Sequence, residues 1–160
     1  ESDLFFSGMR PAVNVGLSVS RVGGAAQTKA MKKAAGSLRI DLAQCREMEV
    51  FTQFSSDLDP ATKEMIQYGK GLTEMLKQPL CHPMSLHDQV ISLVAANNRL
   101  LLDVEVSTIK GFQKEMLAFF EQKHPEIVKE IEEKKVLSDE LKQSILDGVK
   151  EFKQNTMASF

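Results

Sequence analysis

Hydrophobic positions after residue 24 recur every three or four residues, which is the spacing of one buried face on an α-helix. The first such stripe runs from residue 31 to residue 51, and Gly36 interrupts it, so we expect the glycine to bend or divide this helix. The stripe consists of Met31, Ala34, Leu38, Leu42, Cys45, Met48 and Phe51. A second stripe consists of Met65, Tyr68, Leu72, Met75 and Leu76.

Helix start signals divide the rest of the chain. Asp59-Pro60 has the pattern of an N-cap followed by proline at the first helical position, and Ser85 and Ser138 are further N-cap candidates. The helices expected after residue 80 are about 86–98, 106–122 and 125–134, with a last one after Ser138. Ile109, Phe112, Met116 and Phe120 should face inward, as should Leu141, Ile145, Val149 and Phe152. The pattern predicts a mainly α fold, a bundle of five or six helices.

The first 24 residues follow a different pattern. Apolar Val13, Val15, Leu17 and Val19 alternate with small or polar residues, a period of two that suits a strand or an extended loop. A piece this short does not fold alone, so we expect it to belong to a sheet formed by chain outside this sequence. We therefore predict two parts: 1–24, the end of another domain, and 25–160, the helical bundle.

Composition narrows the functional classes. The 160 residues are 42% hydrophobic and 26% charged, as in a soluble protein with a buried core, and the formal net charge of -2 does not favour nucleic acid. No apolar run approaches the roughly 18–20 residues that span a bilayer, so we expect no direct membrane insertion. The two cysteines, Cys45 and Cys81, are far apart, which suggests free thiols in a reducing compartment. The chain begins at Glu1, not Met, which suggests a start inside a longer protein.

Chemical motifs are sparse. The sequence lacks the G-x-x-x-x-G-K-S/T phosphate loop, so the chain alone should not bind or hydrolyse ATP in the usual way. Cys81, His82, His87 and Asp88 form the one cluster of possible metal ligands, but their spacing fits a tetrahedral zinc site poorly, and we expect no metal there. Arg21 lies where the extended pattern gives way to the helical one. On position alone, most such arginines pair with a carboxylate or a helix end.

A specific motif surrounds Arg21. The run from Gly8 to Gln27, GMRPAVNVGLSVSRVGGAAQ, resembles the alpha subunit of F-type rotary ATP synthases. The resemblance continues through KAMKK at 29–33, LAQ at 42–44 and RE at 46–47. It resumes with QF at 53–54, SDLD at 56–59 and LKQ at 76–78. The strong motifs cover the first half of the chain, and the second half fits the helical C-terminal bundle of that family more loosely.

The resemblance implies roles for four residues. Arg21 matches the arginine finger of the family, which reaches across a subunit interface to the terminal phosphate of a nucleotide on the neighbouring beta subunit. Arg10, Pro11 and Gln78 match positions that border the adenine of the non-catalytic nucleotide on alpha itself. A second glutamine that is usual two residues after Gln78 is Leu80 here, which removes one polar contact to the base.

The resemblance also implies that residues 1–24 are the C-terminal remnant of a nucleotide-binding domain, with the arginine-finger loop, and that the chain works in a proton- or sodium-driven ATP synthase. The partners would be beta subunits and the central-stalk gamma subunit, and the bundle would form a collar around that stalk. ATP or ADP with Mg²⁺ would bind the complete subunit, whereas we expect no cofactor on the isolated chain, which should be inactive. The complex would be peripheral, on the cytoplasmic face of a bacterial membrane or on an organellar inner membrane.

Two alternatives remain at this point. The chain could be a free-standing helical adaptor derived from an alpha subunit, without a nucleotide role. A pure adaptor would need none of the four residues above, which argues against it. The chain could also be an unrelated enzyme that uses Cys81, His82 and His87, and a metal assay would decide that possibility.

Overall fold

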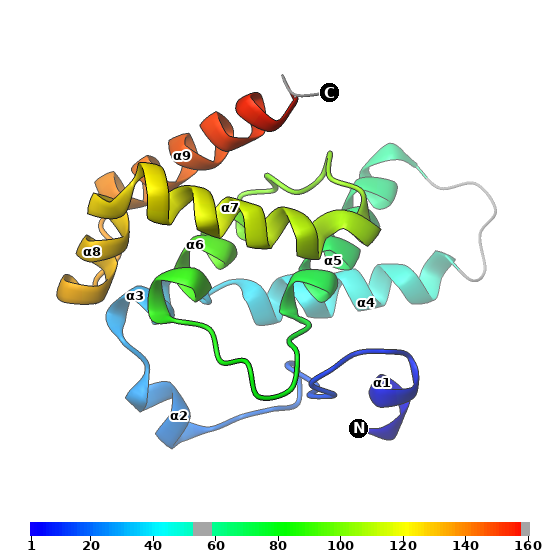
Figure 1. Cartoon of the computed structure of the whole chain (residues 1–160). Coiled ribbons are helices and arrows are strands. Elements are labelled where there is room, and N and C mark those ends of the chain that lie inside the picture. Colours follow the sequence, from blue (N-terminus) through cyan, green and yellow to red (C-terminus); the bar gives the residue numbers. More distant parts are fainter. Residues whose placement is uncertain (53–58, 158–160) are drawn as a thin grey trace.

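The structure is a computed structural model that describes residues 1–52 and 59–157 (Figure 1). This part of the chain forms nine α-helices and one short 3-10 helix, with no strand, so the predicted mainly α fold is confirmed. The helices are α1 (Ser2–Phe6), α2 (Arg21–Ala26), α3 (Lys29–Ala34), α4 (Leu38–Thr52), α5 (Pro60–Leu76), α6 (Leu86–Asn97), η1 (Val106–Thr108), α7 (Ile109–Lys123), α8 (Pro125–Lys134) and α9 (Asp139–Met157). The six long helices α4 to α9 form the predicted bundle.

Helix α6 joins two hydrophobic cores. One core packs α3, α6, α7, α8 and α9 together, and its largest fully buried side chains include Ile91, Met116, Phe120, Ile131 and Ile145. The other core packs α4 against α5 and includes Leu38, Leu42, Cys45, Leu72 and Met75. Ala96 at the end of α6 and Ile109 at the start of α7 also belong to the second core. Figure 1 shows α8 at one end of the molecule and the end of α4 at the other.

The three predicted helix caps are confirmed because each rests on a local hydrogen bond, whereas the helix predicted at about 106–122 begins only at Ile109, after the 3-10 turn η1. The Asp59 carboxylate accepts from the backbone N–H groups of Ala61 and Thr62 at the start of α5. Ser85 caps α6 by accepting from the Asp88 N–H, and Ser138 accepts from the Leu141 N–H. Each cap satisfies a backbone donor that the first turn of a helix leaves without an intrahelical partner.

The glycine in the first apolar stripe also acts as predicted. Helix α3 ends at Ala34, a turn contains Gly36, and α4 begins at Leu38, so the stripe is divided between two helices. Ala34, Leu38, Leu42 and Cys45 are buried. Met31 and Met48 are half-buried, whereas the side chain of Phe51 and the segment 53–58 lie outside the described residues.

The first 24 residues consist of α1, a long loop and the start of α2. The alternating segment 13–19 is irregular chain with a turn, which is the loop alternative of the two structures that its period allowed. A strand needs a hydrogen-bonded neighbour, and the described residues provide none. Neither α1 nor α2 was predicted, and α2 runs across the expected domain boundary at residue 24. The division into 1–24 and 25–160 stays a prediction.

Candidate functional site

Three of the four residues singled out in the sequence line one groove. Arg10 and Pro11 follow α1, and Gln78 follows α5, yet all three border an open hollow of about 1130 Å³. The loop 79–84 and the first half of α7 complete its wall. Residues nearly 70 positions apart are therefore brought to the same surface, as the predicted base site requires.

Backbone and side-chain contacts fix these residues in place. The Gln78 backbone N–H donates to the Arg10 carbonyl oxygen at 2.8 Å, which ties the N-terminal segment to the end of α5. The Gln78 side-chain Nε2 donates to the carbonyl oxygen of His82 at 2.6 Å. The Arg10 guanidinium carbon lies 4.4 Å from the centre of the Phe5 ring, a cation–π contact. The amide group of Gln78 is thus oriented before any ligand arrives.

The walls of the groove are mostly apolar, with a few polar groups. Among the lysines that line it, Lys77 pairs with Glu74 at 2.6 Å. Lys110 Nζ donates to the Met75 carbonyl oxygen at 2.7 Å and to Gln113 Oε1 at 2.9 Å. Burial lowers the pKa of the Lys110 amine. A concave apolar surface with a few oriented polar groups is the usual form of a site for a small organic ring.

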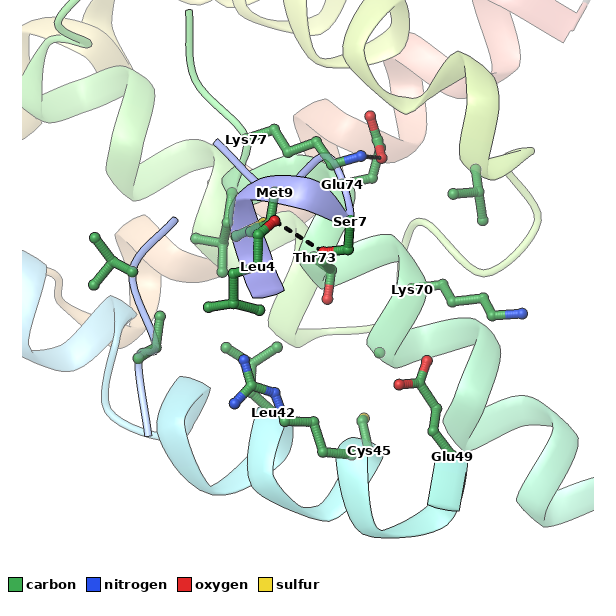
Figure 2. Close-up of a pocket in the computed structure, with 16 residues that line it drawn as sticks. Leu4, Ser7, Met9, Leu42, Cys45, Glu49, Lys70, Thr73, Glu74 and Lys77 are labelled. Atoms are coloured by element: carbon green, nitrogen blue, oxygen red, sulfur yellow. Dashed lines mark hydrogen bonds and ion pairs between the residues drawn. The ribbon is translucent and has the colours of Figure 1, made fainter. Parts of the chain in front are cut away.

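A second hollow of about 300 Å³ lies between α1, α4 and α5 (Figure 2). Neither Arg10, Pro11 nor Gln78 lines it. Figure 2 shows Cys45 of α4 on its floor, below Leu4 and Ser7. Burial raises the pKa of the Cys45 thiol to about 11, so the thiol stays protonated at neutral pH and is a poor nucleophile.

Arg21 does not line either hollow. It is the first residue of α2, and the Ser20 hydroxyl caps that helix by accepting from the Gly23 N–H at 2.9 Å. Residues 16–27 are all exposed. The Arg21 side chain makes no hydrogen bond or ion pair with any residue in 1–52 or 59–157. The pairing expected of most arginines at such a position is absent from this part of the chain, and the guanidinium is left on the surface.

Comparison with known proteins identifies the fold. The family described as "ATP synthase alpha/beta chain, C terminal domain" matches residues 27–152. The chain belongs to this family. Two relatives, the ATP synthase subunit alpha of two strains of Clostridium kluyveri, are each 51% identical over 154 residues. The alignment covers 96% of this chain and 31% of each relative, so the chain spans about a third of their length.

The comparison extends the resemblance beyond the motifs that suggested it. The strong motifs lie in the first half of the chain, whereas the alpha/beta C-terminal domain match continues to residue 152, through α6, α7, α8 and most of α9. The second half of the chain, whose motifs resemble the family more loosely, therefore lies within the same family match. The resemblance to an ATP synthase alpha subunit is confirmed.

The metal-ligand cluster considered from the sequence does not come together as one group. Cys81 is exposed, and the His82 Nδ1 lies 2.8 Å from the Leu80 carbonyl oxygen, within its own loop. His87 and Asp88 instead face Glu121 of α7, and His87 also contacts Glu132 of α8. The sequence did not suggest these acidic partners because they lie on later helices, inside a charged stretch typical of a solvated face.

Proposed function

We propose that this chain is the C-terminal part of an ATP synthase alpha subunit and that it supplies Arg21 in trans to a nucleotide on a neighbouring beta subunit. The observation that carries the proposal is the position of Arg21, exposed at the start of a capped helix and unpaired among the described residues. The motif around it supports the same role.

The chemistry of the side chain suits that role. A guanidinium is always charged and presents a planar set of donors that matches phosphate oxygens. An arginine that reaches a transferring phosphoryl group stabilises its developing charge and typically contributes about 10³–10⁵ in rate. The Ser20 cap fixes the start of α2 and thereby restricts where Arg21 can point.

The surroundings of Arg21 support an interface. Leu17, Val19 and Val22 are 74%, 75% and 81% exposed, which is unusual for aliphatic side chains so close together. A cluster of exposed apolar residues marks a surface that another protein or domain covers. A beta subunit that covers this segment would place Arg21 beside its nucleotide.

The groove at Arg10, Pro11 and Gln78 would hold the adenine of ATP or ADP. The Gln78 Nε2 already donates to His82, so its Oε1 is left to accept from the exocyclic amine of the base. Leu80, which is 89% exposed on the groove wall, offers only an apolar contact. The phosphates and Mg²⁺ need a phosphate loop, which this sequence lacks, so other parts of the complete subunit would hold them.

The bundle would surround the gamma subunit of the central stalk, with beta subunits as the lateral partners. Within residues 1–52 and 59–157, no helix is both long and apolar enough to cross a membrane. The chain would reach the membrane through these partners, on the cytoplasmic face in bacteria. The isolated chain would be inactive, because the nucleotide that Arg21 serves belongs to another subunit.

A chimeric subunit tests this proposal. In it, the present chain replaces the matching region of the Clostridium kluyveri alpha subunit, and the chimera is assembled with beta and gamma subunits. We expect the complex to assemble and to hydrolyse ATP. Assembly without turnover would favour the helical adaptor instead, and failure to assemble, with the chimera itself folded, would contradict both.

A further inference from the structure

Three carboxylates converge on one imidazole where α6, α7 and α8 meet. His87 and Asp88 lie in the first turn of α6, Glu121 lies near the end of α7, and Glu132 lies in α8. His87 is only 14% exposed, whereas Glu121 is 62% exposed, so the cluster is fixed on its inner side and open to solvent on its outer side. Of the four residues, Asp88 also lines the groove, whereas His87, Glu121 and Glu132 do not.

Glu132 sets the orientation of the imidazole. Its Oε1 lies 2.6 Å from the His87 Nδ1 and also accepts from the His87 backbone N–H at 3.1 Å. The bond from His87 lowers the pKa of the Glu132 carboxyl. A carboxylate at one ring nitrogen holds the proton there and leaves a lone pair on the other, which is the arrangement found behind most metal-binding histidines.

The other ring nitrogen faces the Ser85 hydroxyl, whose oxygen lies 3.1 Å away, and two further carboxylates. The His87 Nε2 lies 3.5 Å from Asp88 Oδ1 and 3.8 Å from Glu121 Oε1, and the three atoms all lie within 4.8 Å of one another. Ligand atoms about 2.0–2.1 Å from a tetrahedral zinc ion are about 3.4 Å apart. The two distances from the His87 Nε2 are 0.1 and 0.4 Å longer than that value. A cation that replaced the Ser85 hydroxyl at Nε2 would lie between the imidazole nitrogen and two negative oxygens.

We propose that His87, Asp88 and Glu121 form a binding site for a divalent cation of the zinc class, with Glu132 as the residue that orients His87. Imidazole nitrogen and carboxylate oxygen are ligands that zinc accepts, and three protein ligands leave a fourth position for water. Because the ligands come from α6 and α7, and the orienting group from α8, the cation would link three helices of the bundle. The ligand set differs from the sequence-derived cluster, for which no metal was expected, since Cys81 and His82 take no part.

Zinc titration of the full chain tests the site. Calorimetry with Zn²⁺ alone at neutral pH should give one saturable site, and Co²⁺ should give the visible absorption of a tetrahedral complex. His87→Gln should weaken Zn²⁺ binding at least 100-fold, and Glu121→Gln, at an exposed position that tolerates the change, at least tenfold. Glu132→Gln should weaken it about 10–100-fold, the effect of removing an orienting group.

Matched controls make the test decisive. Glu133→Gln changes a neighbouring exposed carboxylate on α8, and His82→Gln and Cys81→Ser change the other candidate ligands. All three should bind Zn²⁺ as the unchanged chain does. Absence of saturable binding at millimolar Zn²⁺ would overturn the proposal, as would loss of binding in Cys81→Ser with retention in both His87→Gln and Glu121→Gln. Circular dichroism without metal would verify that each variant is folded.

Discussion

Gly69 on α5 lies against Cys45 on α4, so closely that a β-carbon added to the glycine would come within 2.7 Å of the cysteine sulfur. The sulfur is itself held, because the thiol donates to the Met65 carbonyl oxygen at 3.4 Å. Gly69→Ala should therefore destabilise the chain by about 1–3 kcal/mol through overpacking, although alanine favours a helix by about 1 kcal/mol over glycine. Urea unfolding measures the change.

Gly111 provides the matched control, because it lies in α7 with no atom within 4 Å of an added β-carbon. Gly111→Ala should stabilise the chain by about 0.5–1 kcal/mol through the lower backbone entropy of alanine in the unfolded state. Equal effects of the two substitutions would contradict the close approach of α4 and α5.

Ser92 and Gln113 form a buried hydrogen bond between α6 and α7. The Gln113 Nε2 donates to the Ser92 Oγ at 2.9 Å, and the residues are 3% and 5% exposed. Ser92→Ala should lower the free energy of unfolding by about 1–3 kcal/mol, because it leaves a buried amide donor without its partner. In a double-mutant cycle, Ser92→Ala with Gln113→Leu should cost less than the sum of the single changes. Additive costs would show that the bond does not couple the two helices.

The Asp59 cap should make stability depend on pH. Hydrogen bonds from Thr62, first from its hydroxyl and then from its backbone N–H, lower the pKa of the Asp59 carboxyl in the folded chain. A lowered folded-state pKa contributes stability above the unfolded value of about 3.9, and that stability is lost as pH falls through the folded pKa. Asparagine also caps helices well. The loss of stability caused by Asp59→Asn should thus be largest near neutral pH and smaller in acid.

Urea unfolding of both proteins over a pH series measures this difference. Thr62→Val removes the largest cause of the shift and should reduce the pH dependence without removing the cap. A stability difference between Asp59→Asn and the unchanged chain that stays constant down to about pH 2 would contradict the lowered pKa of Asp59.

Local signals made much of this fold predictable from the sequence. Asp59, Ser85 and Ser138 cap helices through bonds to residues two or three positions away, so the information lies within each short segment. The apolar stripes identified the buried faces for the same reason. The segment 13–19 was harder, because its alternation fits both a strand and an exposed loop, and only the presence of a neighbouring strand separates the two.

The candidate sites, too, were predictable only in part from the sequence. The motif around Arg21 indicated its role by resemblance, but the structure was needed to show that its guanidinium has no partner in the described chain. Arg10 and Gln78 are brought together by a backbone bond that no sequence pattern predicts. The sequence singled out His87 and Asp88 but not their acidic partners, because Glu121 and Glu132 look like ordinary surface acids until three helices bring them to one imidazole.

Leu80 should weaken adenine recognition in the groove. Leu80→Gln in the complete subunit should increase the affinity of the non-catalytic site for ATP, because it adds a side-chain acceptor and donor for the base. Gln78→Leu should lower that affinity, by about tenfold for one lost hydrogen bond of roughly 1–1.5 kcal/mol. Gln143→Leu on α9, away from the groove, is the control. Fluorescent ATP binding measures all three, and unchanged affinity in both groove variants would exclude this groove as the base site.

The most direct test of the central claim is the rate of ATP hydrolysis after Arg21→Ala in the complete complex. The variant should assemble normally and lose about 10³–10⁵ in turnover, because an arginine finger contributes that much to phosphoryl transfer. Lys29→Ala, which removes a nearby exposed cation, should leave turnover unchanged. Arg21→Lys should recover little, since an ammonium lacks the planar donor set. Normal turnover in an assembled Arg21→Ala complex would contradict the account.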